Sequence, residues 1–147
     1  MEDLEIEVMI DTDVVIDYLR RRPDPNAEQL FHAVKTNELT AHMSSITVFE
    51  LCRGARISPE PEKRLGEVKV LRSYVNVLPF NGEAAYKASE ICVSLETRGE
   101  PLEIRDLFIA ASAIIHGVPL ITRNVSHFKR VPDMRALTPS DLLAEKG

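Results

Sequence analysis

The stretch Ile6-Glu7-Val8-Met9-Ile10-Asp11-Thr12-Asp13-Val14-Val15-Ile16 decides how this chain is expected to fold. Residues 6–10 form a short, mostly apolar run, which predicts a strand of four or five residues. The three polar residues that follow are good helix caps. A helix is expected to begin there, to include the mostly apolar residues 14–19, and to end before Pro23. The stretch therefore predicts a strand that passes directly into a helix, with a carboxylate at the junction.

The rest of the chain repeats this alternation. Further strands are expected at residues 39–43, 75–78 and 118–122, with a last one at 134–137. Helices are expected from Asn26, from Ser44 or Ser45 to about residue 57, from Pro59 or Pro61 through Leu71, from Asn81 to Gly99, and from Asp106 to Gly117. Strands that alternate with helices form a parallel sheet covered on both faces. The predicted fold class is α/β, a three-layer α/β/α sandwich with a central parallel sheet, and residues 1–147 are expected to form a single domain.

Composition limits the class of protein. Apolar residues make up 44% and charged residues 28% of the 147 residues, as in ordinary globular proteins. No apolar stretch approaches the roughly 20 residues that span a bilayer, so no membrane association is expected. Cys52 and Cys92 lie in predicted helices and are expected to be buried thiols in a reducing, cytoplasmic environment. The net charge of −5 argues against a protein that coats nucleic acid, but a nuclease with an acidic metal site remains possible.

Polar side chains recur at one end of the predicted sheet. Asp11 follows the first strand, Glu50 lies one turn into the helix after the second, Asp106 opens a nearly all-apolar helix, and Asn124 follows the strand 118–122. Ligands bind at the carboxyl ends of parallel strands, so these four residues are expected to face one cavity. Taken singly, each has a simpler explanation as a helix cap, a solvated acid or a turn residue. Their conjunction is what indicates a site.

Carboxylates brought together repel one another and are costly to bury unpaired. A divalent cation with oxygen ligands resolves both problems, and Mg²⁺ or Mn²⁺ suits such ligands. The four histidines, His32, His42, His116 and His127, are scattered and show no zinc-binding spacing with the cysteines. The sequence therefore predicts a magnesium or manganese site.

Four segments, residues 10–16, 47–54, 106–113 and 120–128, carry a resemblance to a known family. They contain, in order, an Asp at the end of a strand, a Glu followed by Leu and then Gly, an Asp that opens an alanine-rich helix, and a final Thr-Arg-Asn. The chain resembles the PIN-domain ribonucleases, in particular the VapC-type toxins of VapBC toxin–antitoxin pairs, over nearly its whole length. One position departs from the pattern: many relatives carry Asp three residues after the Asn, where this chain has His127. Asn124 is therefore taken as the fourth contributor.

The resemblance implies a metal-dependent endoribonuclease that hydrolyses RNA phosphodiester bonds. The implied catalytic residues are Asp11, Glu50, Asp106 and Asn124, of which Asp11, Glu50 and Asp106 hold Mg²⁺ or Mn²⁺, with Thr12 and Thr122 orienting the carboxylates. Arg53 and Arg123 are candidates for contact with RNA phosphates, unless they pair with carboxylates instead. The resemblance also implies a homodimer and a tight complex with an antitoxin, whose C-terminal segment lies across the acidic pocket. Whether the chain is a toxin or a housekeeping nuclease is left open.

Two other functions compete with this interpretation. In a haloacid-dehalogenase-like phosphatase, Asp11 would be the nucleophile and Asp13 the acid–base, but no suitable lysine or late pair of acids follows and the chain is short for that family. In a non-catalytic PIN-type module, the domain would bind only RNA or an antitoxin. The intact Asp11, Glu50 and Asp106 argue against the second function, while His127 keeps it open.

Overall fold

The computed structural model describes residues 6–146, and its strands form a five-stranded parallel sheet in the order β3-β2-β1-β4-β5. The strands are β1 (Glu7–Ile10), β2 (Thr40–Ser44), β3 (Asn76–Leu78), β4 (Leu120–Ile121) and β5 (Ala136–Leu137). The helices are α1 (Thr12–Leu19), α2 (Pro25–Lys35), α3 (Ser45–Arg56), α4 (Pro61–Leu71), α5 (Gly82–Thr97), α6 (Ile104–His116), α7 (Val125–Phe128) and α8 (Pro139–Lys146). The predicted α/β class with a central parallel sheet is confirmed.

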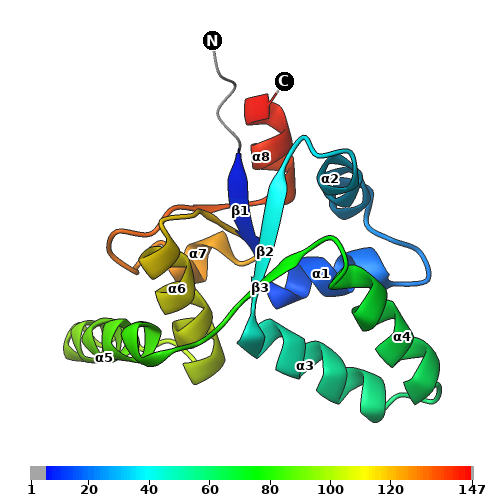
Figure 1. Ribbon diagram of the computed structural model, residues 1–147. Coiled ribbons are helices and arrows are strands. Elements are labelled where there is room, and N and C mark those ends of the chain that lie inside the picture. The colour runs from blue at the N-terminus through cyan, green and yellow to red at the C-terminus, as the bar shows by residue number, and fades with distance from the viewer. Residues whose placement is uncertain (1–5, 147) are drawn as a thin grey trace.

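Helices cover both faces of the sheet, as Figure 1 shows with α5, α6 and α7 on one side and α1 to α4 on the other. Side chains of β1 alternate between the two layers: Val8 and Ile10 join the core under α1, α2, α3, α4 and α8, whereas Met9 joins the core under α5, α6 and α7. The three-layer sandwich is therefore confirmed. The expectation of a single domain over residues 1–147 reaches beyond the described residues and stays a prediction.

Several element boundaries differ from the sequence prediction. Helix α6 begins at Ile104, so Asp106 lies in its first turn rather than opening it, a position where an acidic side chain still favours the helix. Helix α2 is capped by Asp24, whose carboxylate accepts hydrogen bonds from the backbone N–H groups of Asn26 and Ala27. Pro25 then occupies the first helical turn, where its missing N–H costs nothing. Cys52 and Cys92 are partly rather than fully buried, and both are free thiols.

Backbone hydrogen bonds join the carboxyl ends of β1, β4 and β5, where the polar residues begin. The backbone N–H of Asp11 donates to the carbonyl of Ile121 at 2.9 Å, and that of Thr122 donates to Leu137 at 2.8 Å. Gly117, with φ of 67°, ends α6 in the left-handed conformation and returns the chain toward β4. Across residues 6–146, no helix combines the length and the apolar character needed to cross a membrane.

Ile121 is fully buried in the two-residue strand β4, which positions Thr122 at the carboxyl end of the sheet. We expect Ile121→Ala to lower the free energy of unfolding by about 2–5 kcal/mol, because it removes buried methyl groups and leaves a cavity. Urea unfolding followed by circular dichroism measures this change in the free energy of unfolding. Val93→Ala, at a side chain that is 64% exposed on α5, is the control and is expected to cost under about 0.5 kcal/mol. Equal losses in the two variants would contradict the assignment of Ile121 to the core.

Candidate active site

Asp11 is a buried carboxylate at the carboxyl end of the sheet, with 5% of its surface exposed. Its Oδ1 accepts a hydrogen bond from the backbone N–H of Thr12 at 2.9 Å, and its Oδ2 accepts one from the hydroxyl of Thr122 at 2.7 Å. The Thr122 hydroxyl in turn accepts from the backbone N–H of Asn124 at 3.0 Å. Two neighbouring parallel strands therefore fix the orientation of this carboxylate.

Glu50 reaches the same site from α3. Its Oε1 accepts a hydrogen bond from the hydroxyl of Thr12 at 2.7 Å, and the buried hydroxyl of Thr47 lies 3.0 Å from Thr12 Oγ1. Its Oε2 lies 3.2 Å from Nη1 of Arg105. Thr12 and Thr122, which the sequence analysis expects to orient the carboxylates, each donate a hydrogen bond to one of them.

Electrostatic effects show that the acidic residues share one environment. Burial, together with the charges of Asp13 and Asp106, raises the pKa of Asp11 to about 7, although the hydrogen bonds from Thr122 and Thr12 act to lower it. Burial also raises the pKa of Asp106, as do the charges of Glu103 and Glu50, while His127 lowers it. Asp11, Glu50 and Asp106 are thus brought together, although they come from three different elements.

Asp13 also belongs to this site, although its sequence position did not identify it as a site residue. Its Oδ2 accepts hydrogen bonds from the backbone N–H of Arg123 and from Nδ2 of Asn124, both at 3.2 Å. Its Oδ1 is buried and has no hydrogen-bond partner within residues 6–146. Burial raises its pKa, while its contacts with Arg123 lower it. The available signal was a second acid two positions after Asp11, which the sequence analysis treated as a helix cap or a phosphatase residue.

The three remaining predicted residues lie around this group. Asn124 holds Asp13 through its amide nitrogen. Arg123 turns toward carboxylates: its Nε lies 3.1 Å from Oδ2 of Asp17 and 3.7 Å from Oδ2 of Asp13. This is the pairing that the sequence left open as the alternative to phosphate contact. Arg53 is exposed on α3, three residues after Glu50.

The donor atoms of the site suit a hard divalent cation. Asp11, Asp13, Glu50 and Asp106 supply carboxylate oxygens, the ligands that Mg²⁺ and Mn²⁺ prefer. The buried Oδ1 of Asp13, which has no hydrogen-bond donor among the described residues, is the kind of oxygen that a cation satisfies. Within residues 6–146, no three acidic, histidine or cysteine side chains already surround a common point. Mg²⁺ commonly keeps several waters among its ligands, so its binding does not require a complete cage of protein side chains.

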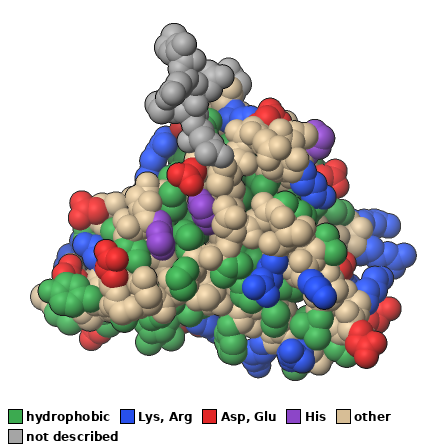
Figure 2. All heavy atoms as spheres, in the orientation of Figure 1, with side chains coloured by type: hydrophobic (Ala, Val, Ile, Leu, Met, Phe, Trp, Pro, Cys, Tyr) green, Lys and Arg blue, Asp and Glu red, His purple; other side chains and the backbone are tan. Residues whose placement is uncertain are grey.

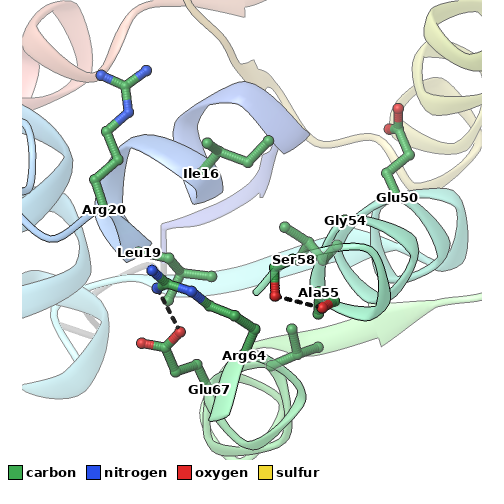
Figure 3. A pocket seen from close by; sticks show the side chains of 11 residues that line it. Ile16, Leu19, Arg20, Glu50, Gly54, Ala55, Ser58, Arg64 and Glu67 are labelled. Carbon is green, nitrogen blue, oxygen red and sulfur yellow. Dashed lines mark hydrogen bonds and ion pairs between the residues drawn. The ribbon is translucent and has the colours of Figure 1, made fainter. Parts of the chain in front are cut away.

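A groove begins beside Glu50 and runs between α1, α3 and α4 (Figure 3). Its volume is about 320 Å³. The lining is mainly apolar, with charged side chains at the rim, and comprises Ile16, Leu19, Arg20, Glu50, Leu51, Gly54, Ala55, Ser58, Arg64, Glu67 and Val68. Arg64 and Glu67 pair with each other at 2.9 Å, so part of the rim is neutral. Glu50 is thus shared between the acidic site and an apolar groove.

The fold and the site together define the class: a parallel α/β/α sandwich with carboxylates gathered at the carboxyl ends of its strands. The family follows from the sequence, because residues 8–134 match the PIN domain model, and the chain belongs to the PIN domain family. The family resemblance stated from the four sequence segments is therefore confirmed.

Several known proteins align with this chain over most of their own length. Ribonuclease VapC1 of Haemophilus influenzae is 32% identical over 127 residues, which are 86% of this chain and 93% of that protein. The tRNA(fMet)-specific endonuclease VapC of Salmonella typhimurium is 31% identical over 130 residues, 88% of this chain and 96% of that protein. Among solved structures, the DNA-bound VapBC of Salmonella typhimurium superposes with a TM-score of 0.82 at 29% identity, over 91% of this chain and 98% of that one.

We expect the metal-free protein to lose stability as the pH rises from about 4 to about 7. Burial raises the pKa of Asp11 to about 7 in the folded protein, against an ordinary value of 3.8. The folded state therefore holds more protons than the unfolded state in this range. The stabilisation is complete below the unfolded pKa and is lost as the pH passes the folded pKa. The loss is on the order of a few kcal/mol.

Urea unfolding in EDTA at pH 5, 6, 7 and 8 measures this pH dependence. Asp11→Asn is the control, because its amide stays neutral at every pH and should flatten the profile. Addition of Mg²⁺ at pH 8 is expected to restore stability to the wild type more than to the variant. Identical pH profiles for the two proteins would contradict the assignment of the raised pKa to Asp11.

Proposed function

We propose that this chain is a metal-dependent endoribonuclease, the toxin of a type II toxin–antitoxin pair, which hydrolyses RNA phosphodiester bonds with Mg²⁺ or Mn²⁺. The observation that carries the proposal is the buried carboxylate of Asp11, gathered with Glu50 and Asp106 in a chain of the PIN family. Relatives named as ribonucleases and as a tRNA(fMet)-specific endonuclease support an activity on RNA. RNA as the substrate is consistent with a cytoplasmic location.

The proposed chemistry assigns each site residue a task. Asp11, Glu50 and Asp106 hold the cation, directly or through water, and Asn124 completes the site by fixing Asp13. A bound cation would neutralise charge on the phosphate and would make water at the site more acidic. Glu50, next to both the acidic group and the open groove, positions the attacking water. The hydroxyls of Thr12 and Thr122 keep the carboxylates in place during this step.

Clustered basic side chains can bind the RNA backbone although the net charge of the chain is −5. Figure 2 shows Lys and Arg side chains gathered over α3 and α4. The basic residues of α3, of α4 and of the position after α4 are Arg53, Arg56, Lys63, Arg64, Lys69 and Arg72. Of these, Lys63 and Arg64 are paired with Glu60 and Glu67. Contacts of this kind neutralise phosphates and supply affinity that does not depend on sequence. Arg53 is the proposed phosphate contact on this surface, whereas Arg123 is already paired with Asp17.

The two competing functions are less well supported. A match to the PIN domain over residues 8–134 favours a nuclease over a haloacid-dehalogenase-like phosphatase. A non-catalytic module would have no need to bury Asp11 and to hold Glu50 beside it. His127 stands where many relatives carry Asp, and its effect on the pKa of Asp106 indicates that it lies near the site without removing any of the three carboxylates.

An antitoxin is the proposed protein partner, because several solved neighbours are VapBC toxin–antitoxin complexes. The apolar groove beside Glu50 suits an amphipathic segment of that partner, ending in a basic residue at the acidic site. A homodimer is also proposed. Phe49 and Ile104, which are 58% and 59% exposed, offer apolar surface for a second copy to cover.

The purified chain, free of antitoxin, is expected to cleave RNA in the presence of Mg²⁺ or Mn²⁺, and EDTA is expected to abolish the cleavage. Asp106→Asn and Glu50→Gln are expected to lower the rate at least about 100-fold, because each removes a carboxylate from the cation site. Cleavage of total tRNA and of a single-stranded RNA, followed on gels, measures the rate. Circular dichroism controls for folding. Full activity in Asp106→Asn, or cleavage that persists in EDTA, would refute the proposed site.

The groove is tested separately through antitoxin binding. Ile16 is 45% exposed and lines the groove, so Ile16→Glu is expected to weaken binding of the antitoxin at least about tenfold by placing a charge on an apolar contact. Val93→Glu on α5 introduces the same charge at an exposed apolar side chain outside the groove and is expected to change affinity less than about twofold. Isothermal titration with a candidate antitoxin, sought as the product of a short reading frame next to the gene, measures both affinities. Equal affinities would place the antitoxin elsewhere.

A further inference from the structure

Arg105 lies among three carboxylates at the edge of the site. It occupies the first turn of α6, directly before Asp106, and 48% of its side chain is exposed. Its Nη1 lies 3.2 Å from Oε2 of Glu50, and its Nη2 lies 3.0 Å from Oε1 of Glu103. These two carboxylates and Asp106 raise the pKa of the Arg105 guanidinium. A permanent positive charge therefore stands where the proposed cation must approach.

This contact determines which oxygen Glu50 can offer. Its Oε1 is held by the Thr12 hydroxyl and its Oε2 by Arg105. Among residues 6–146, Arg105 is the basic residue that pairs with Asp11, Glu50 or Asp106. Arg123 pairs with Asp13, whose unpartnered Oδ1 also suits a cation, and with Asp17. Glu50 therefore cannot turn Oε2 fully to a cation without weakening the pair with Arg105.

We propose that Arg105 is the counter-ion of the metal-free site and that Glu50 exchanges it for the cation, after which the guanidinium contacts a phosphate of the RNA. The proposal rests on the proposed ribonuclease function. An ion pair this exposed contributes little to stability, so the exchange costs little. A guanidinium carries five N–H donors, and its planar fork matches two oxygens of a phosphate. Arg105 thereby couples the binding of metal to the binding of RNA.

Arg105 is better placed for this task than the two arginines expected from the sequence. Arg123 is held by Asp17, itself 5% exposed, so it would have to leave a buried carboxylate. Arg53 lies on the outer surface of α3 and forms no ion pair within the described residues. Arg105 alone of the three contacts a proposed metal ligand while nearly half of its side chain remains open to solvent.

The first measurement is Mn²⁺ binding to the metal-free protein without RNA, by isothermal titration. Arg105→Gln is expected to bind Mn²⁺ about 3- to 10-fold more tightly than the wild type, because a competing positive charge is gone. Arg105→Lys, which keeps the charge, should stay within about twofold. Arg135→Gln is the matched control, an exposed arginine paired with Glu145 at 2.7 Å outside the site. Unchanged Mn²⁺ affinity in Arg105→Gln would overturn the counter-ion assignment.

The second measurement is RNA cleavage at saturating Mn²⁺. Arg105→Gln is expected to raise KM about 3- to 10-fold and to change kcat by less than about threefold. The slope of log KM against log salt concentration is expected to fall by about 1, the change that follows from losing one phosphate contact. Arg105→Lys should recover part of the KM loss, and Arg135→Gln should match the wild type. Unchanged KM and salt dependence would overturn the phosphate contact. A wild type that cleaves no RNA would refute the proposed function, and the Mn²⁺ titration would still decide the counter-ion assignment.

Discussion

The hydrogen bond from Thr122 to Asp11 joins residues that are 111 positions apart in the chain and closes the acidic site at its most buried point. A carboxylate with 5% exposure has lost nearly all of its water, and burial of such a group without partners is costly. The backbone N–H of Thr12 and the hydroxyl of Thr122 replace part of that hydration. The Thr12 N–H is a local contact, whereas the Thr122 hydroxyl reaches Asp11 through the parallel pairing of β1 with β4, so the second donor depends on the register of the sheet.

The site combines a rigid half and an adjustable half. On the rigid side, Asp11 and Asp13 accept hydrogen bonds from residues 122–124 and lie at the start of a helix whose first turn favours negative charge. On the adjustable side, Glu50 is 19% exposed and is held by the Thr12 hydroxyl and by the guanidinium of Arg105, whose side chain is 48% exposed. Glu50 also faces the apolar groove. An RNA segment and an antitoxin segment that both require this residue would therefore exclude one another.

Local sequence patterns predicted the sheet, its helices and three of the acids, because apolar periodicity and capping residues are local signals. The parts that sequence reasoning missed depend on contacts between distant positions. Arg105 meets Glu50 across 55 positions, and Asp13 meets Arg123 across 110, and neither pairing leaves a pattern in the sequence. Helix α7 was missed because four residues are too few for a periodic signal, and α8 because its apolar residues 142–144 are consecutive and show no helical spacing. The order of the strands likewise follows from packing and not from any one segment.

Charge balance explains why the site suits a divalent cation in particular. Asp11, Asp13, Glu50 and Asp106 supply four carboxylates, and Arg105 and Arg123 supply two guanidinium groups that contact this set. Asp17 contacts both Arg123 and Arg20, so counting Asp17 and Arg20 together leaves this balance unchanged. Glu103 is 65% exposed, where water screens its charge. Two negative charges remain when every acid is ionised. Without a cation, a proton on Asp11 relieves part of this excess, whereas a divalent ion removes it and leaves all four carboxylates ionised.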